Sequence, residues 1–435
     1  MSNDPKSYKD ALNWLMYELP KTNEEVFSGE AGKQRVRKLL DRLGNPQDDH
    51  RTIHVAASSG KGTIAMLATQ LLLANNRSVG TIMSPHVYDL RERFLVNGQK
   101  ESKRNVLIAL EKIRRVVLQL NGEGVYPSYY ETVLAVGYLV FSVHKLDYIV
   151  VETGFGGRLD GTNHITRKDK VAVLGQIGLD HVDILGDTLE KIAREKAGIV
   201  SRYTAAVALE QDSGVNEVFK SRSEEQEAKL TFINGESFRA KQSLNLGSLN
   251  SSFVGNHNYD DLALALSAVQ YVAQRDDWKF ASESIVNAVI RFQLPGRFEV
   301  IKSACREIIL DGAHSEQKLA AFVQALKKNY PEMKFSIVFA CARKRNPETL
   351  INILKPICNE FVFTKYGALK NDAKRRAYDF TGYKVDGVPS TTMNNAEKVI
   401  EYIAQAYASS WLVTGSFFLV SDLGPLLAKQ NRRAN

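Results

Sequence analysis

One segment, residues 53–63, constrains the fold of this chain more than any other. It runs from a β-branched stretch through a loop of small residues into an apolar helical pattern that begins at Thr63. Small residues let backbone N–H groups approach phosphate oxygens, and a helix N-terminus adds partial positive charge. This order predicts an ATP-phosphate cradle built from Gly60, Lys61, Gly62 and Thr63, in which the lysine reaches the terminal phosphates and the hydroxyl holds Mg²⁺.

The strict phosphate-loop pattern is not met by this segment. That pattern requires a glycine where the chain has Val55, and a hydroxyl directly after the lysine, where it has Gly62. The segment alone therefore leaves two interpretations open, a nucleotide-binding loop and an ordinary glycine turn before a helix.

The composition is that of a globular protein, and its positive net charge suits acidic ligands. The 435 residues suffice for two or three domains, and 44% of them are hydrophobic and 24% charged. The net charge of +8 suits nucleotides or polycarboxylates. The basic runs at residues 343–345 and 374–376 lack interleaved aromatic residues, so we expect no nucleic-acid partner.

The three cysteines, Cys305, Cys341 and Cys358, lack metal-ligand spacing. This usage suits a reducing cytoplasm and argues against a disulfide framework or a zinc site. The polar N-terminus does not resemble a signal peptide, and no apolar run reaches membrane-spanning length. We therefore expect a cytoplasmic protein with no membrane partner.

Apolar runs alternate with helical patterns along the chain. The runs are continuous, as in parallel strands buried on both faces, which predicts an α/β fold with right-handed crossovers. Candidate strands are residues 52–55, 79–83, 148–151, 171–174, 308–310, 335–339 and 411–413, and candidate helices include residues 262–273 and 396–408. Pro295 and Gly296, within residues 293–297, mark the predicted boundary between domains of residues 1–294 and 295–435.

Polar side chains follow five of the candidate strands. They are Ser84, Glu152, His181, Asp311, His314 and Ser416. Ligands of α/β sheets bind at the carboxyl ends of the strands, so these side chains predict a site at that edge, although each alone is an ordinary loop residue. Oxygens from Thr63, Ser84 and Glu152 suit Mg²⁺, whereas His181 fits either a metal-linked role or a helix-capping or orienting role.

Lys196 also allows two interpretations. Residues 187–190, Asp-Thr-Leu-Glu, resemble a capping box that begins a helix, and Gly198 ends that helix. Lys196 lies in its last turn, where a cation suits the helix dipole. The residues alone favour this structural role over a functional one.

Seven segments together resemble the folylpolyglutamate synthase/dihydrofolate synthase family of the Mur ligase superfamily. The resemblance extends from about Tyr8 to Leu427, and its motifs are HVAASSGKGT, SPHVYDLRERFLVNG, VVETGFGGRLDGTN, IGLDHVDILGDTLEKIAREKAGIV, LPGRFEV, DGAH and LVTGSFFLV. It implies a larger Mur-ligase-like N-terminal P-loop ATPase domain and a smaller C-terminal Rossmann-like α/β domain, with the active site in the cleft between them.

The resemblance also implies an ATP-dependent amide ligation. ATP would phosphorylate a carboxylate of a folate or dihydropteroate, the amino group of L-glutamate would attack the acyl phosphate, and phosphate would leave. The partners would be these small molecules, with ATP and two Mg²⁺ as cofactors, and we expect a monomer.

The family roles fall on residues of both domains. In the first domain, Lys61 and the amides of Gly60–Thr63 would hold phosphates, while Thr63, Ser84, Glu152 and His181 would serve two Mg²⁺ sites. Lys196 would be carbamylated by CO₂ and so supply an oxygen ligand, which overturns its structural interpretation. Arg93 and Tyr130 would lie near the pterin.

The remaining family roles concern the nucleotide and glutamate. Asn256, in the segment that opens the interdomain helix, and the hinge residue Arg297 would meet ATP. Asp311 would hold the ribose, and His314 and Ser416 would lie near the incoming glutamate. Lys61, Lys196, His181 and His314 are the implied catalytic residues.

Several positions depart from the family pattern. Ala57, Ser58 and Ser59 replace Gly-Thr-Asn in the phosphate loop, and a methyl at Ala57 crowds the turn if that position needs positive φ. Ser315 replaces an asparagine after DGAH, and Asp261 replaces an asparagine associated with adenine. An ionised carboxylate cannot donate a hydrogen bond, so Asp261 predicts weaker discrimination of ATP from GTP.

Two alternatives to a folate ligase remain open. One is a Mur-type ligase that acts on another carboxylate, and the other is a non-catalytic paralogue that binds folate or nucleotide. The intact set of Lys61, Glu152, His181 and Lys196 favours catalysis.

Overall fold

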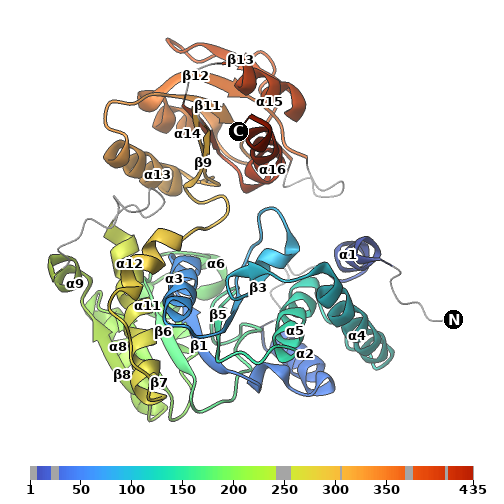
Figure 1. The fold of residues 1–435 in the computed structure, drawn as a ribbon, viewed down its shortest axis with the longest axis vertical. Helices are drawn as coiled ribbons and strands as arrows, with labels where there is room; N and C mark the ends of the chain where they lie inside the picture. The colour runs from blue at the N-terminus through green and yellow to red at the C-terminus, as the bar shows by residue number, and fades with distance from the viewer. Residues whose placement is uncertain are drawn as a thin grey trace. The chain divides into compact units, whose positions relative to one another are not determined.

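The computed structural model describes residues 7–20, 29–241, 256–303, 306–367, 376–406 and 410–434 (Figure 1). The chain divides into two compact units, and the second begins at Gln293, the first residue of the predicted boundary segment. Residues 87–90 differ from the expected division because they cluster with the second unit. Val87 is buried there against a core that includes Val420 and Leu423.

The first unit contains an eight-stranded sheet in the order β4-β3-β2-β5-β1-β6-β7-β8. Six neighbouring strands pair in parallel, namely β2, β5, β1, β6, β7 and β8. Strands β3 and β4 add an antiparallel edge beside β2. The strands are β1 (Arg51–Ala56), β2 (Val79–Ile82), β3 (Phe94–Val96), β4 (Gln99–Lys100), β5 (Tyr148–Glu152), β6 (Val171–Leu174), β7 (Ala205–Leu209) and β8 (Lys229–Ile233).

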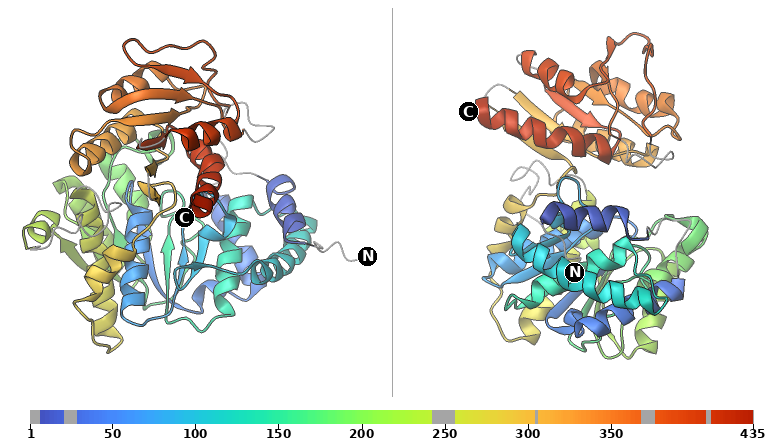
Figure 2. Two further views of the ribbon diagram at one scale, coloured as in Figure 1. Left: turned by 45° about the horizontal axis from the view of Figure 1, so that its top comes forward. Right: turned by 90° about the vertical axis from the view of Figure 1, so that its right-hand side faces the viewer.

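Helices cover both faces of this sheet (Figures 1 and 2). They are α1 (Tyr8–Tyr17), α2 (Gly29–Leu43), α3 (Lys61–Ala74), α4 (Lys103–Gly122), α5 (Tyr129–Ser142), α6 (Val182–Leu185), α7 (Leu189–Ala197), α8 (Ser213–Glu225), α9 (Gly235–Lys241), α11 (Asn256–Arg275) and α12 (Ser284–Arg291). Short 3₁₀ turns lie at η2 (Pro46–Asp48) and η3 (Leu90–Arg93).

Two neighbouring residues of β2 show how the layers form. The Thr81 hydroxyl lies 2.7 Å from the hydroxyl of Thr69 on α3, whereas Gly80 faces the ring of Phe141 on α5. Successive strand residues point to opposite faces, so α3 and α5 cover opposite sides of the sheet. The glycine is required because a Cβ at Gly80 would stand 2.9 Å from the Phe141 ring.

The second unit contains a six-stranded sheet in the order β13-β12-β11-β14-β10-β9, in which only β9 among these strands is antiparallel. The strands are β9 (Glu299–Ser303), β10 (Arg306–Leu310), β11 (Phe335–Phe339), β12 (Cys358–Phe363), β13 (Ser390–Thr392) and β14 (Trp411–Thr414). The helical segments are α13 (Glu316–Asn329), α14 (Pro347–Leu354), η4 (Lys355–Ile357), α15 (Ala396–Gln405) and α16 (Phe417–Ala434).

Alternating residues of β10 divide the core of the second unit into two halves. Ile309 packs in one buried cluster, and its neighbours Ile308 and Leu310 pack in the other. Strands buried on both faces read as continuous apolar runs, which is why the sequence predicted them. The expected α/β class is confirmed.

The predicted elements agree with the structure except in details of their ends. The helix after the phosphate loop begins at Lys61 rather than Thr63. The expected capping box at residues 187–190 is wrong: Thr188 alone caps α7 by accepting from Lys191 N, and the Asp187 carboxylate pairs with the Lys191 ammonium at 2.7 Å. Within the described segments, no helix is long and apolar enough to cross a membrane.

Candidate active site

The predicted phosphate loop connects β1 to α3 in the first unit. Gly60 is the N-cap of α3 with φ +81°, a conformation that favours glycine. Ala57 is not among the described residues with positive φ, so its methyl group does not strain the loop. The Lys61 ammonium donates to the Ala57 carbonyl at 3.0 Å, which folds the side chain back over the loop. The first amides of α3 lack partners four residues earlier within the helix, as a phosphate site requires.

Glu152, at the end of β5, lies beside this loop. A Cβ on Gly62 would stand 3.7 Å from both carboxylate oxygens of Glu152, and the backbone N–H of Ser84 donates to Glu152 Oε2 at 2.9 Å. The carboxylate is 5% exposed. The structure therefore brings Glu152, Ser84 and the start of α3 together at the carboxyl edge of the sheet.

Lys196 is 1% exposed in the last turn of α7. Its pKa is lowered to about 7, chiefly by burial and also by the nearby Lys61 ammonium, against the opposite effect of Asp180 and Asp160. The approach of α7 depends on Gly157, where a Cβ would stand 2.6 Å from the Glu195 carbonyl. A buried lysine facing another lysine is poorly explained by the helix dipole alone.

His181 adopts a left-handed conformation, φ +50°, before α6. His181 is the N-cap residue of α6, and its side chain makes no capping hydrogen bond. The ring packs edge-on against Phe155 at 4.7 Å, and Nε2 lies 3.6 Å from Asp180 Oδ1. Because Asp180 also acts on Lys196, these two side chains belong to the same region of the site.

Arg93 and Tyr130 occupy neighbouring positions in the first unit. Arg93 Nε lies 2.8 Å from His86 Nδ1, and its guanidinium stacks 5.8 Å from the centroid of Tyr129. The Tyr130 hydroxyl donates to Asp160 Oδ1 at 3.4 Å, and its ring fills the space beside Gly154. Burial raises the pKa of Tyr130 well above its usual value, so the phenol stays neutral.

The donor set of the first unit fits magnesium rather than zinc. Glu152 offers a buried carboxylate beside Gly62, and Thr63 and Ser84 offer hydroxyls close in sequence to this contact. Magnesium typically takes one or two carboxylates and completes its shell with phosphate and water. Across the described ranges, no three His, Cys, Asp or Glu side chains form a metal-ligand cluster of their own.

In the second unit, Arg297, His314 and Phe417 lie together. The Arg297 guanidinium stacks 5.3 Å from the centroid of Phe417, and the His314 ring lies 5.8 Å from the same ring. His314 Nδ1 is 2.8 Å from the Gly312 carbonyl. A carbonyl only accepts, so Nδ1 carries the proton and Nε2 keeps a lone pair. Burial lowers the pKa of His314, which favours this neutral form.

Asp311 and Ser416 are held by the backbone around them. The Asp311 carboxylate accepts from Phe298 N at 2.9 Å and from Ala313 N at 2.8 Å, and burial raises its pKa to about 6. Ser416 Oγ accepts from Phe418 N at 3.1 Å at the start of α16. Ser315, where the family has asparagine, caps α13 by accepting from Lys318 N.

Asn256 begins α11, and its side chain lies outside the described atoms. Asp261, on the same helix, is 5% exposed, and its carboxylate lies against Gly60. Burial raises its pKa well above the usual value, and Oδ2 has no hydrogen-bond partner in the described part of the chain. Burial therefore disfavours the ionised form of Asp261 that the sequence suggested.

Sequence reasoning missed three residues of these sites. Asp160 is buried and accepts from the backbone of Phe155 and Thr162, and Asp180 contacts His181 and raises the pKa of Lys196. Phe417 provides the aromatic surface beside Arg297. Asp160 and Asp180 stand within quoted motifs, but a single carboxylate in a loop carries no signal of burial, and Phe417 reads as an ordinary apolar residue.

The fold and these residues define the class of the protein. Residues 296–417 match the family described as Mur ligase, glutamate ligase domain. The fold matches solved structures over nearly the whole chain: a folylpolyglutamate synthase from Thermotoga maritima is 23% identical with a TM-score of 0.80, covering 97% of both chains. The chain has the Mur ligase fold, with two α/β units.

Proteins of similar sequence and structure indicate which ligases of this fold the chain resembles. A Bacillus subtilis protein named dihydrofolate synthase/folylpolyglutamate synthase is 26% identical over 96% of this chain and 98% of its own length. A Saccharomyces cerevisiae dihydrofolate synthetase is 24% identical over 91% of this chain and 97% of its own. A Mycobacterium tuberculosis folylpolyglutamate synthase solved with ADP and AMPPCP is 25% identical, with a TM-score of 0.74 over 91% and 95% of the two chains. The chain is a homologue of the folylpolyglutamate and dihydrofolate synthases.

Proposed function

We propose that this protein is an ATP-dependent ligase that joins L-glutamate to a carboxylate of a folate or dihydropteroate. A carboxylate is a poor electrophile, so its oxygen first attacks the γ-phosphorus of ATP and ADP leaves. The amino group of glutamate then attacks the acyl carbon, loses a proton and expels phosphate. The relatives named for this activity align over nearly the full length of the chain, which supports the proposal.

The observation that carries the proposal is the placement of Lys61 and Lys196 at one end of the first sheet. Lys61 starts the helix that follows the glycine loop, and its charge reaches Lys196. Two buried or half-buried cations repel each other unless anions lie between or beside them. Phosphate groups at the loop would supply that negative charge, and Lys61 would neutralise charge as it develops during phosphoryl transfer.

Carbamylation of Lys196 belongs to the same proposal. Only a neutral amine attacks CO₂, and a pKa of about 7 leaves much of Lys196 neutral at physiological pH. The amine nitrogen bonds to the carbon of CO₂ and releases a proton, which replaces a cation with a carboxylate-like group. That change removes the repulsion from Lys61.

Magnesium would be held by Glu152, Thr63 and Ser84, with His181 and carbamylated Lys196 serving a second ion, directly or through water. When bound, it supplies further charge neutralisation at the phosphoryl group. The chain's own part is to orient these ligands: Ser84 N donates to Glu152, and Asp180 lies against His181.

In the second unit, His314 is suited to the glutamate substrate. Its Nε2 lone pair can accept a proton or a hydrogen bond from an ammonium group, since Nδ1–H is committed to Gly312. Arg297 and Asp311 are proposed for the nucleotide, and Ser416 for glutamate. Arg93 and Tyr130 remain proposed contacts of the pterin.

The test is to incubate the purified protein with ATP, Mg²⁺ and glutamate, together with either dihydropteroate or tetrahydrofolate. We expect a product heavier by one glutamyl residue, and phosphate release that requires all substrates. Equal ATP turnover without glutamate, or no ligated product with any pteroate or folate, contradicts a folate ligase. Nucleotide binding without turnover would instead support a non-catalytic paralogue.

A further inference from the structure

A cavity opens at the opposite edge of the first sheet from the phosphate loop. Its volume is about 740 Å³, and its lining includes Lys33, Asp48, Ser201 and Arg222. Asp48 precedes β1 and Ser201 precedes β7, so the cavity lies where these parallel strands begin. The phosphate loop follows the end of β1, whose six residues span about 20 Å. None of the residues proposed for the active site lines this cavity.

A buried lysine stands directly behind this cavity. Lys170 is 0% exposed, and its ammonium donates to Ser201 Oγ at 2.6 Å. Within the ranges that the structure covers, Lys170 forms no ion pair. Its pKa is lowered to about 7, chiefly by burial and also by the charges of Arg222 and Lys33, against the opposite effect of Asp48. A fully buried lysine without a carboxylate partner is uncommon, because an unpaired charge is costly in a protein interior.

Ser201 connects this lysine to the cavity. The ammonium form of Lys170 only donates, so Ser201 Oγ accepts from it and must donate its own proton elsewhere. No acceptor for that proton is found among the described residues. Because Ser201 lines the cavity, its hydroxyl is available to an acceptor that enters it.

Arg222 adds a cation with unused donor capacity. Its Nη2 donates to the Val200 carbonyl at 3.1 Å, which holds the guanidinium next to Ser201, and Nη1 pairs with the exposed Glu225 at 3.3 Å. Its Nε is buried without a hydrogen-bond partner in the described part of the chain. Lys33, also on the lining, forms no ion pair within the described segments.

Two carboxylates on the lining are already engaged by neighbouring groups. Asp48 accepts from the amide and hydroxyl of Thr166 at 2.7 and 2.8 Å, and Asp41 pairs with Arg37 at 3.9 Å. Four lysines and arginines and three carboxylates line the cavity, and Lys170 adds a further cation behind it. Arg158 pairs with Glu195 at 2.9 Å, so Lys33 and the buried Lys170 are the cations of this region that have no ion pair within the described segments.

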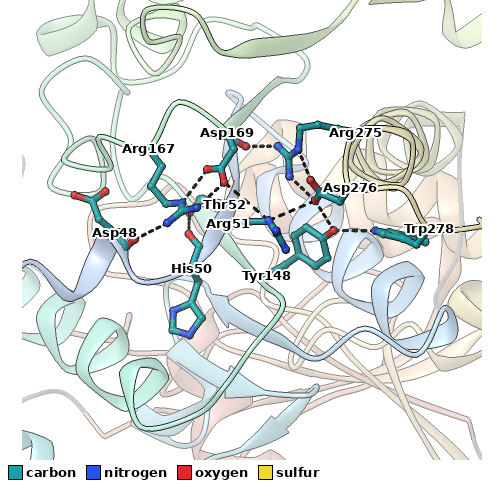
Figure 3. A network of polar contacts seen from close by, with 10 residues as sticks. All are labelled: Asp48, His50, Arg51, Thr52, Tyr148, Arg167, Asp169, Arg275, Asp276 and Trp278. Atoms are coloured by element: carbon teal, nitrogen blue, oxygen red, sulfur yellow. Dashed lines mark hydrogen bonds and ion pairs between the residues drawn. The ribbon is translucent and has the colours of Figure 1, made fainter.

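A network of ion pairs holds this edge of the sheet in place (Figure 3). Arg167 donates to the Asp48 carbonyl at 2.9 Å and pairs with Asp169, the residue before Lys170. Arg51 links Asp169 to Asp276, which also accepts from the Tyr148 hydroxyl (Figure 3). These contacts fix the start of β1, β5 and β6, so the donors around Ser201 need little reorganisation to receive a ligand.

We propose that this cavity is a second ligand site, which binds a small anion through a carboxylate or phosphate group. The acidic oxygens of the ligand accept from the Ser201 hydroxyl and the Arg222 guanidinium, with the Lys170 ammonium behind Ser201. This site does not depend on the proposed ligase activity.

The test measures binding of citrate and, separately, inorganic phosphate to the full-length protein by calorimetry, without nucleotide. We expect saturable binding of at least one of them, which also distinguishes a carboxylate site from a phosphate site. Ser201→Ala, Arg222→Gln and Lys170→Met should each weaken it at least about tenfold, since each removes a charged or charge-assisted contact. Lys170→Met keeps the side-chain volume. If Lys170→Met or Arg222→Gln fails to fold, the loss of binding in Ser201→Ala still tests the proposal.

Two matched controls locate the site. Arg202→Gln removes an arginine next to Ser201 in sequence that instead pairs with Glu227, and it should change binding less than twofold. Lys61→Ala disrupts the phosphate loop and should also leave this binding unchanged. The proposal is overturned if Lys61→Ala loses binding while Ser201→Ala retains it. It is also overturned if neither anion binds saturably at millimolar concentration.

Discussion

The carboxylate of Asp261 lies directly against the α-carbon of Gly60. A Cβ at Gly60 would stand 2.5 Å from Oδ1 and 2.6 Å from Oδ2, so only glycine permits this contact. An ionised carboxylate here would repel phosphates held by the same loop. Burial and the nearby Asp260 charge instead raise the pKa of Asp261, which favours a neutral acid beside the loop.

The first prediction concerns stability. Asp261 has a raised pKa in the folded state and about 3.9 when unfolded, so the folded protein holds the proton more tightly. Stability therefore falls as pH rises from about 4 toward the folded pKa. Asp261→Asn should remove this dependence and be more stable at pH 8 by more than about 1 kcal/mol. Urea unfolding at pH 5 and pH 8 measures the free energy of unfolding of both proteins. An equal change with pH in the parent and in Asp261→Asn would contradict a buried neutral acid.

The second prediction concerns nucleotide choice. A protonated carboxyl group has one donor and one acceptor, as an asparagine amide also offers. The ratio of kcat/KM for ATP to kcat/KM for GTP should therefore differ by less than about twofold between Asp261→Asn and the parent near neutral pH. A larger difference would require the gain or loss of about one hydrogen bond to the base. A much stronger preference for ATP in the variant would show that Asp261 meets the base as an ionised acceptor.

The third prediction concerns Lys61. Replacing it with alanine removes a cation from the phosphate loop and should lower kcat/KM at least about hundredfold, with the melting temperature little changed. Lys112→Ala, an exposed lysine on α4, is the matched control and should keep normal turnover. Near-normal activity of Lys61→Ala would remove this residue from the phosphate site.

The fourth prediction concerns Lys196. Protein equilibrated with ¹³C-labelled bicarbonate should give a carbamate carbon signal that is absent in Lys196→Ala. Carbamylation requires the neutral amine, so the signal should grow as pH rises through about 7. Activity of Lys196→Ala should recover in part with short carboxylates. A free ammonium at Lys196 in active, metal-loaded protein would refute carbamylation.

The fifth prediction concerns His314. His314→Ala removes the Nε2 acceptor and should raise KM for glutamate at least about tenfold, the value of one hydrogen bond to a charged group. Binding of ATP measured without glutamate should stay the same. An equal loss of ATP affinity would show that His314 supports the nucleotide or the fold instead.

The sequence predicted the strands better than the contacts of the site. Residues 171–174 and 335–339 were predicted with the bounds of β6 and β11 because continuous apolar runs reflect burial on both faces. The contact between Asp261 and Gly60 joins α11 to the phosphate loop, and no local pattern encodes such a long-range approach. The structural interpretation of Lys196 was reasonable from its helix position alone, because burial beside Lys61 becomes visible only when α7 is packed.

The packing of residues 87–90 was equally hidden from local analysis. Val87 and Tyr88 follow a strand of the first unit, which suggested the first domain. The Tyr88 hydroxyl donates to Glu299 at 2.7 Å, and Val87 is buried in the second core. Apolar residues in a loop show that burial will occur, but they do not identify the partner.

The most direct test of the proposed chemistry follows an oxygen atom. The folate or dihydropteroate substrate is labelled with ¹⁸O in its reacting carboxylate and converted with ATP and glutamate, and the released phosphate is analysed by mass spectrometry. An acyl phosphate intermediate transfers one ¹⁸O from the carboxylate to phosphate in each turnover, and the Lys61→Ala variant should release almost none. Unlabelled phosphate accompanied by ligated product would contradict the acyl phosphate route.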